Sequence, residues 1–298
     1  MIRKISLDHI ILGHNQFFGT NHMSSEKGFD TASYFNQIEN VMNIIEYAFD
    51  EGATGIMLST HPNAILIKDA IIKNKKLNGN LNVYILLPYM AKYVRMMNEK
   101  GLINIITDIL KQANFKEKIN LMSKSTLGLV NRDFITILKA IIDIEILPFK
   151  ALPIKAIFLH NSLTDILVSL KLFNVLKIFD DYLVDKLHIS PGYCTLNFHS
   201  VINFFLENHY DEPTIMAPFN PIGFQMNPSK KVNEDILTSS RANIIAMSTL
   251  ASGFVNPKDA YMYISTLPQI KSLIVGASSK KHIRESFTEI KRNLYSKN

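Results

Sequence analysis

The sequence contains one cysteine, Cys194, and no tryptophan among its 298 residues. A single cysteine excludes a disulfide framework within the chain, and it excludes zinc or iron–sulfur sites built on several thiolates. Long apolar runs are also missing, because residues 10–12 stop at Gly13 and residues 156–159 stop at His160. Neither run approaches the roughly 20 apolar residues of a membrane-spanning helix. Since residues 1–6 lack the apolar part of a signal peptide, we expect a cytoplasmic protein with no membrane partner.

The sequence has only a small excess of positive charge. It has 32 Lys and Arg against 26 Asp and Glu, a formal net charge of +6. Basic pairs at residues 75–76, 230–231 and 280–281 are scattered, whereas nucleic-acid binders gather such residues into a dense stripe. The hydrophobic fraction of 47% is typical of a globular protein with a buried core. We therefore expect a small-molecule ligand and no nucleic-acid partner.

Short apolar segments alternate with longer amphipathic segments along the chain. The expected strands cover residues 9–13, 55–59, 83–87, 155–160, 186–190, 214–217, 243–247 and 272–276. The expected helices cover residues 34–50, 63–75, 102–110, 134–146, 164–182, 200–207 and 279–294, with another starting near residue 257. This alternation predicts an α/β fold, a closed (β/α)8 TIM barrel, with residues 1–298 forming a single domain. An open doubly wound sheet would normally carry a glycine-rich turn after its first strand, and residues 13–17 do not match that pattern.

Residues 90–152 show only helical patterns and are too long for one connecting helix. We interpret this segment as an ordinary helix plus a helical insertion after the third strand. Such an insertion leaves the barrel at the carboxyl-terminal ends of the strands, where it could form a lid or an interface. Its apolar residues need cover from the barrel or from a second subunit, so we expect a homo-oligomer.

Three histidines follow expected strands at the end where TIM barrels carry their active sites. His14 follows the first strand, His61 the second and His160 the fourth, with Asn161 directly after His160 and Tyr89 shortly after the third strand. These five residues are the candidate catalytic residues. No Asp or Glu ends a strand, which leaves histidine as the expected proton carrier.

The three histidines admit two interpretations. Three neutral imidazoles with an open fourth position would suit a catalytic zinc-like ion. Alternatively, they line a pocket and form hydrogen bonds with a substrate. No H-x-H or H-E-x-x-H spacing favours the metal, and both interpretations stay open.

A group of small and hydroxyl-bearing residues follows the seventh and eighth strands. Close backbone approach to a ligand is possible at Gly276, and Ser278 and Ser279 can cap the helix that follows. Free amides at that helix start, with Lys280 nearby, would favour a phosphate group. The alternative is a plain serine cap with solvated lysines. Ser248 and Ser252, which follow the seventh strand, complete the candidate cofactor-binding set.

Four segments resemble the aldo-keto reductase superfamily, most clearly near the two ends of the chain. Residues 12–19 (Leu-Gly-His-Asn-Gln-Phe-Phe-Gly) are similar to the opening of the family's first strand, and residues 47–53 to the helix end before its second strand. Residues 246–253 (Ala-Met-Ser-Thr-Leu-Ala-Ser-Gly) resemble the segment at the family's seventh strand, and residues 273–283 the strand-eight segment that holds cofactor phosphate. The resemblance implies a (β/α)8 barrel and hydride transfer with a nicotinamide cofactor such as NADP.

The catalytic positions depart from the family's pattern. Aldo-keto reductases use an Asp, Tyr, Lys and His set, and the Asp and Tyr positions fall on Met57 and Pro62. The third expected strand ends in residues 86–88, Leu-Leu-Pro, without a lysine, so only His160 matches. Without the family's tyrosine, the usual general acid for a carbonyl oxygen is missing.

Four hypotheses follow from the sequence. The first is an enzyme with an aldo-keto reductase-like barrel, a histidine-based site and a small anionic or phosphorylated substrate. The second is an NAD(P)-dependent oxidoreductase with a rearranged site, in which Tyr89 or His160 supplies the proton. The third is a metal-dependent hydrolase or lyase that uses the three histidines, and the fourth is a non-catalytic binding protein.

Overall fold

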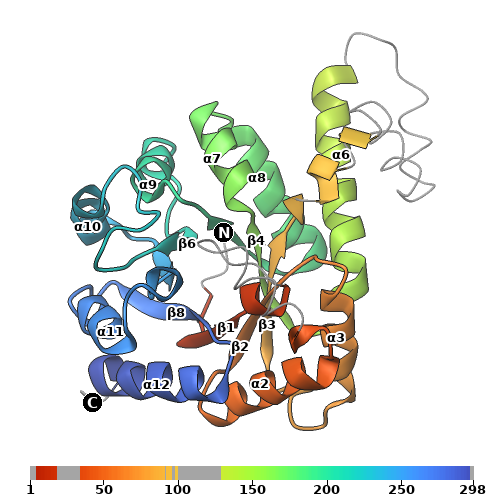
Figure 1. The fold of residues 1–298 in the computed structure, drawn as a ribbon. Helices are drawn as coiled ribbons and strands as arrows, with labels where there is room; N and C mark the ends of the chain where they lie inside the picture. Colours follow the sequence, from red (N-terminus) through yellow and green to blue (C-terminus); the bar gives the residue numbers. More distant parts are fainter. Residues whose placement is uncertain (1–4, 19–33, 91, 96–97, 100–128, 296–298) are drawn as a thin grey trace.

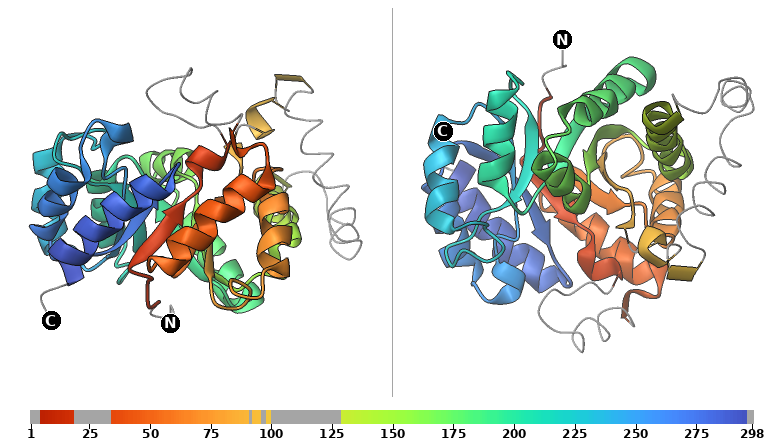
Figure 2. Two further views of the ribbon diagram at one scale, coloured as in Figure 1. Left: turned by 60° about the horizontal axis from the view of Figure 1, so that its bottom comes forward. Right: turned by 90° about the horizontal axis from the view of Figure 1, so that it is seen from above.

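The computed structural model describes residues 5–18, 34–90, 92–95, 98–99 and 129–295. Eight parallel strands form a closed barrel in the order β1 to β8, and β8 pairs with β1 to close the ring. The strands are β1 (Ile10–Gly13), β2 (Gly55–Ser59), β3 (Asn82–Leu87), β4 (Ile154–Leu159), β5 (Ser190–Cys194), β6 (Thr214–Pro218), β7 (Asn243–Met247) and β8 (Ile270–Gly276). Figures 1 and 2 show helices on the outside of these strands, so the prediction of a (β/α)8 TIM barrel is confirmed.

The helices surround the barrel and bury their apolar faces against it. They are α2 (Ile38–Asp50), α3 (Ala64–Lys73), α6 (Leu129–Ile146), α7 (Asn161–Ser169), α8 (Phe173–Asp181), α9 (Phe198–Glu207), α10 (Lys230–Ser239), α11 (Pro257–Ser265) and α12 (Lys280–Ile290). In α12, for example, Ile283, Phe287 and Ile290 recur at helical spacing and are fully buried. No helix among the described residues is long and apolar enough to cross a membrane.

The described residues also form short turns of 3-10 or π helix. They are η1 (Asn15–Phe18), η2 (Leu147–Phe149), η3 (Tyr182–Leu187), η4 (Ala251–Gly253) and η5 (Lys291–Tyr295). Of these, η1 and η4 follow β1 and β7, at the end of the barrel where the sequence places the site.

The prediction for the fifth strand was wrong. Residues 186–190 were expected to form it, but 182–187 form the π-helical turn η3 and the strand is Ser190–Cys194. Its sequence, Ser-Pro-Gly-Tyr-Cys, has the composition of a turn. The glycine is required by packing, because a Cβ on Gly192 would lie 2.4 Å from the ring of Phe158 on β4.

Two helix predictions also need correction. The single helix expected over residues 164–182 is two helices, α7 and α8, separated by a turn in which Lys171 has a φ of 55°. A helix that was not expected, α10, lies between β6 and β7. The expected helix over residues 102–110 lies outside the described residues, while the one over 134–146 falls within α6.

A cluster of hydrogen bonds centred on Asp8 fills the amino-terminal end of the barrel. The carboxylate accepts bonds from Tyr84 Oη (2.5 Å), Thr54 Oγ1 (2.7 Å), Asn82 Nδ2 (3.0 Å) and Lys155 Nζ (3.0 Å). Burial opposes ionisation of Asp8, but these bonds outweigh it and lower the pKa of the carboxyl group. Asp8 therefore joins β3, β4 and the start of β2 in a partly buried cluster whose groups satisfy one another.

Candidate functional site

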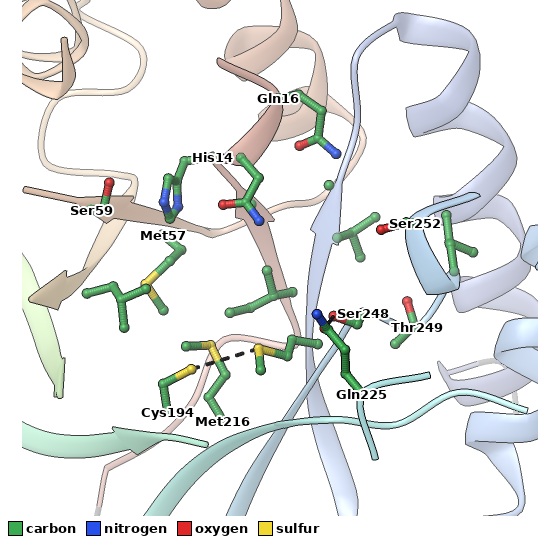
Figure 3. A pocket seen from close by; sticks show the side chains of 18 of the residues that line it. His14, Gln16, Met57, Ser59, Cys194, Met216, Gln225, Ser248, Thr249 and Ser252 are labelled. Carbon is green, nitrogen blue, oxygen red and sulfur yellow. Dashed lines mark hydrogen bonds between the residues drawn. The ribbon is translucent and has the colours of Figure 1, made fainter. Parts of the chain in front are cut away.

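A cavity of about 1080 Å³ opens at the carboxyl-terminal ends of the strands. Its walls include all five candidate catalytic residues: His14, His61, Tyr89, His160 and Asn161. Four of the six candidate cofactor-binding residues also line it, namely Ser248, Ser252, Gly276 and Ser278. Figure 3 shows His14 and Met57 on one side of this cavity, with Ser248, Thr249 and Ser252 on the other. The barrel thus brings together residues from both ends of the sequence.

The histidine side of the cavity is a row of contacting rings. The ring of Phe18 packs against His14, with centroids 5.3 Å apart, and stacks on His61 at 4.5 Å. The Tyr89 ring meets His61 edge-on at 4.8 Å. Because the β1, β2 and β3 ends each supply one polar ring, the row depends on the barrel rather than on any local motif.

Hydrogen bonds from the backbone fix the tautomers of His61 and His160. His61 Nδ1 accepts the N–H of Asn63 at 3.0 Å, and His160 Nδ1 accepts the N–H of Ser162 at 3.2 Å, which caps α7. A nitrogen that accepts carries no proton, so each neutral ring carries its proton on Nε2. Burial lowers the pKa of both groups, and the nearby positive charge of Arg95 lowers that of His61 further. Both rings are therefore neutral hydrogen-bond donors near pH 7.

His14 is buried and presents the opposite polarity. Burial lowers its pKa to about 4, against the weaker opposing effect of a hydrogen bond to the backbone of Met57. A ring nitrogen that donates to a carbonyl leaves the other nitrogen of the neutral ring as an acceptor. The charges of His61 and His160 also lower the pKa of His14, so the three imidazoles are close enough to interact.

The metal hypothesis has no support from the arrangement of ligands. Within the described ranges, no group of three or more His, Cys, Asp or Glu side chains could hold a metal ion. The structure gives a reason, since the apolar ring of Phe18 contacts both His14 and His61. In addition, His61 and His160 each use Nδ1 for a backbone hydrogen bond.

A buried carboxylate behind Tyr89 was missed by the sequence analysis. Glu145, on α6, accepts hydrogen bonds from Lys92 Nζ and Tyr93 Oη, both at 2.7 Å, and from Thr60 Oγ1. Thr60 Oγ1 in turn accepts the N–H of Tyr89 at 3.1 Å. Glu145 thus holds together the segments that carry His61 and Tyr89, so it is a positioning residue. The presence of Asp143 and Glu145 within the otherwise apolar stretch 141–147 was the only signal in the sequence.

The cluster around Glu145 contains an acidic residue, a lysine and a tyrosine (Glu145, Lys92 and Tyr93), the residue types whose usual positions in aldo-keto reductases are not matched in this sequence. These three residues do not form a general acid at the cavity. None of the three belongs to its walls. The Tyr93 hydroxyl donates to Glu145, and burial together with the charge of Glu145 raises its pKa well above the usual range. A raised pKa makes a phenol a weaker acid. Tyr89 is the phenol that lies on the histidine side of the cavity.

Sulfur atoms form much of the cavity floor. Met57, Cys194, Met216 and Met247 come from β2, β5, β6 and β7 and all line the cavity. Cys194 Sγ lies 3.9 Å from Met247 Sδ, the contact marked in Figure 3. Burial raises the pKa of the Cys194 thiol to about 12. The floor is therefore uncharged, apolar and polarisable.

Hydroxyl groups line the side of the cavity formed by β7 and β8. They belong to Ser248, Thr249, Ser252, Tyr261, Ser278 and Ser286. The loop after β7 has an unusual backbone, because Ser248, Ala251 and Ser252 have φ values of 53°, 46° and 57°. Left-handed conformations are costly for residues other than glycine and concentrate at ligand sites. The Tyr261 hydroxyl is buried beside Thr249 and Ser286 without a hydrogen bond of normal geometry in the described structure.

The predicted phosphate site is only partly assembled. Ser279 caps α12 by accepting the N–H of His282 at 3.2 Å and does not line the cavity. Lys280 lies over the ring of Tyr47 on α2, 5.4 Å from its centroid, and is also outside the cavity. The space in front of Gly276 is taken by the amide of Gln16, 2.5 Å from where a Cβ would lie. In their place His282 lines the cavity and contacts Ser278 Oγ at 3.1 Å.

Comparison with solved structures identifies the fold. A Pseudomonas aeruginosa protein described as an aldo-keto reductase superposes with a TM-score of 0.60 over 99% of each chain, at 12% identity. An aldo-keto reductase from a Medee basin deep-sea metagenome library gives 0.55 over 98% of this chain and 88% of the other, also at 12% identity. A thermostable aldo-keto reductase solved with the inhibitor epalrestat gives 0.57 over 99% and 96%, at 10% identity. No family model and no curated protein matches the sequence. The chain has the fold of aldo-keto reductases, and its resemblance to them is confirmed at that level.

Proposed function

We propose that this protein is an oxidoreductase that exchanges hydride between a nicotinamide dinucleotide and a small molecule bound beside His61 and His160. The observation that carries the proposal is the continuity of one cavity. Its β1–β4 side presents imidazole and phenol groups, and its β7–β8 side presents hydroxyl groups and a strained loop. A volume of about 1080 Å³ exceeds what a small substrate alone needs, so it can hold two molecules.

The residues on the β7–β8 side fit a dinucleotide. Ser248, Thr249, Ser252 and Ser278 can donate to phosphate oxygens or exchange hydrogen bonds with ribose. The buried Tyr261 hydroxyl lacks a partner of normal geometry in the described structure and would gain one from such a ligand. A bound nicotinamide would supply the hydride.

The chain's own residues would orient and polarise the substrate. His61 and His160 can each donate Nε2–H to a carbonyl oxygen, as neutral imidazoles do in other barrel enzymes. Both donors keep this state across neutral pH because their pKa values are lowered. Tyr89 lies against His61 and is the candidate proton donor to the oxygen that receives hydride on its carbon. Glu145 and Thr60 would hold Tyr89 in place through its backbone.

The test is a titration of the full chain with NADH and NADPH, followed by nicotinamide fluorescence and thermal shift. We expect saturable binding of the dinucleotide by the wild-type chain. The variant Ser252→Glu adds a carboxylate to the cavity wall and should weaken this binding by about tenfold or more. The control is Ser239→Glu, since Ser239 is exposed on α10 and does not line the cavity. Absence of binding by both dinucleotides, or equal weakening in the two variants, would refute the proposal.

A further inference from the structure

We propose that Asp180 forms a pH-sensitive contact, which holds α8, β5 and the loop after α9 together while its carboxyl group is protonated and loosens them when the group ionises. Asp180 lies on α8, Tyr193 lies on β5, and Tyr210 lies in the loop that follows α9. This proposal does not depend on the function proposed for the cavity. It is supported by the arrangement of the three side chains, by their burial and by the lack of a cation beside them among the described residues.

The two carboxyl oxygens of Asp180 each bond to a different tyrosine. Tyr193 Oη lies 2.5 Å from Oδ1, and Tyr210 Oη lies 2.5 Å from Oδ2. The two phenol groups are also hydrogen-bonded to each other. A protonated carboxyl group therefore closes a ring, in which Oδ1–H donates to Tyr193, Tyr193 donates to Tyr210 and Tyr210 donates to Oδ2. The neutral cluster satisfies its own hydrogen bonds without help from water.

An ionised Asp180 has no cation to balance its charge. Among the described residues no Lys, Arg or His pairs with it, and Lys177, one turn earlier on α8, pairs with Asp181 instead at 3.1 Å. Asp180 is 3% exposed and Tyr193 is fully buried, so water does not solvate the charge. An isolated buried carboxylate is unfavourable and binds a proton more readily. Burial accordingly raises the pKa of Asp180 to about 7, against the opposing effect of the two phenol bonds.

The cluster around Asp8 shows what a cation and further donors change. Asp8 also accepts a 2.5 Å bond from a buried phenol, that of Tyr84, but Lys155 Nζ lies 3.0 Å from its carboxylate and two more side chains donate to it. These bonds outweigh burial and lower the pKa of Asp8, whereas the pKa of Asp180 is raised. Asp8 therefore stays ionised at neutral pH, while Asp180 changes its charge there.

Other ionisable groups on the surrounding elements are exposed or have partners of their own. They are Asp165 on α7, which is bonded to Thr195, Lys139 and Asp143 on α6, which contact Tyr182, the pair Lys177 and Asp181 on α8, and the exposed residues Asp185, Lys186, His188, Glu207, His209 and Asp211. Of these, Lys177 and Asp181 act on Asp180 through their charges, and in opposite directions. The pH response of the cluster therefore comes from Asp180 itself.

The direction of the response follows from the two states. The pKa of Asp180 is 3.8 in the unfolded chain and about 7 in the folded chain, so the unfolded chain releases its proton first as pH rises. Stability from the protonated group is full below the unfolded pKa and is lost as pH rises through the folded pKa. Because β5 ends at Cys194 on the cavity floor, loosening of this strand also reaches the cavity.

Urea denaturation at pH 5, 6, 7 and 8 tests the proposal with two matched variants. Asp180→Asn keeps a donor and an acceptor in place but does not ionise. We expect the unfolding equilibrium constant of wild type, divided by that of Asp180→Asn, to rise about 100-fold between pH 5 and pH 8. Asp181→Asn removes the same charge from a side chain that is 54% exposed and should keep the wild-type response. A ratio that stays constant, or an equal loss of the response in both variants, would overturn the proposal.

Hydrogen exchange of the wild-type chain tests the same contact without a variant. After correction for the intrinsic exchange rate, we expect the amides of residues 173–194 to open about tenfold more often at pH 8 than at pH 6. Residues 82–87, beside Asp8, serve as the internal control and should not show this increase. Unchanged opening of residues 173–194 would refute the proposal, whether or not the variants fold.

Discussion

Titratable groups gather at both ends of this barrel, but they are arranged in opposite ways. At the amino-terminal end, Asp8 accepts hydrogen bonds from four side chains. One of these side chains, Lys155, also forms an ion pair with Asp8. At the carboxyl-terminal end, His61 and His160 each accept a backbone N–H, and the ring of Phe18 packs against His14 and His61. One cluster is complete in itself, while the other leaves polar atoms facing a cavity.

The difference separates a structural role from a binding role. Within the described residues, a buried side-chain polar atom without a hydrogen bond of normal geometry occurs in Gln16 and Tyr261, which line the cavity, and in Asn233 on α10, which does not. None of the groups around Asp8 is left in that state. A protein interior tolerates few unsatisfied polar atoms, and those at a cavity can be satisfied by a ligand. The comparison is consistent with a structural role for the Asp8 end, and it supports the binding role that we propose for the histidine end.

The largest expected effect is on the Asp8 cluster. Replacing Asp8 by Ala leaves the buried hydroxyl of Tyr84 and the half-buried donors of Asn82 and Lys155 without their acceptor. We expect the free energy of unfolding to fall by about 3–5 kcal/mol, measured by urea denaturation. Asp211→Ala is the control, because the Asp211–Arg241 pair is exposed and should contribute less than about 1 kcal/mol. A small effect at Asp8, close to that of the control, would contradict a structural role for the Asp8 cluster.

An intermediate effect concerns His14 and pH. Its folded pKa of about 4 lies below the unfolded value of 6.5, so the unfolded chain takes up a proton first as pH falls. Stability from the neutral ring is full above the unfolded pKa and declines as pH falls towards the folded value. Between about pH 7 and pH 5, wild type should lose about 1–2 kcal/mol more than His14→Gln. Urea denaturation at several pH values measures this, and parallel profiles for the two proteins would contradict it.

The smallest effect is expected at Lys280, which lies at the start of α12 and outside the cavity. Because this side chain lies over Tyr47 and not in the cavity, Lys280→Ala should change the affinities for NADH and NADPH less than about twofold. Stability should fall by about 0.5–1 kcal/mol, the size of an exposed cation–π contact. The neighbouring variant Lys281→Ala serves as the control. A tenfold loss of NADPH affinity specific to Lys280→Ala would instead place this lysine on a phosphate.

Local pattern predicted the barrel because seven of the strands are apolar runs with ordinary boundaries. The strand Ser190–Cys194 escaped, since its Pro191 and Gly192 have the composition of a turn and the need for glycine arises from Phe158, a distant residue. Helix α10 escaped because its sequence, Lys-Lys-Val-Asn-Glu-Asp-Ile-Leu-Thr-Ser, is mostly polar. In both cases contacts with other parts of the fold, rather than the local sequence pattern, determined whether the segment forms a strand or a helix.

The same limit applies to the site. Strand ends in a barrel converge, so the position of His14, His61 and His160 in the sequence was enough to place them in one cavity. The direction of a long side chain cannot be read from its position, and Lys280 turned towards Tyr47. The sequence carried only a weak signal for Glu145, because its partner Thr60 is 85 residues away along the chain. The expectation of a homo-oligomer stays a prediction.

Phe18 has a consequence for the movement of protons across the site. Its ring contacts both His14 and His61, and an aromatic ring neither accepts nor passes a proton as an imidazole or water does. No direct hydrogen bond joins these two histidines among the contacts of the described residues. Each histidine would exchange its proton with a bound molecule or with solvent. The site therefore offers separate proton donors and acceptors rather than a hydrogen-bonded chain of them.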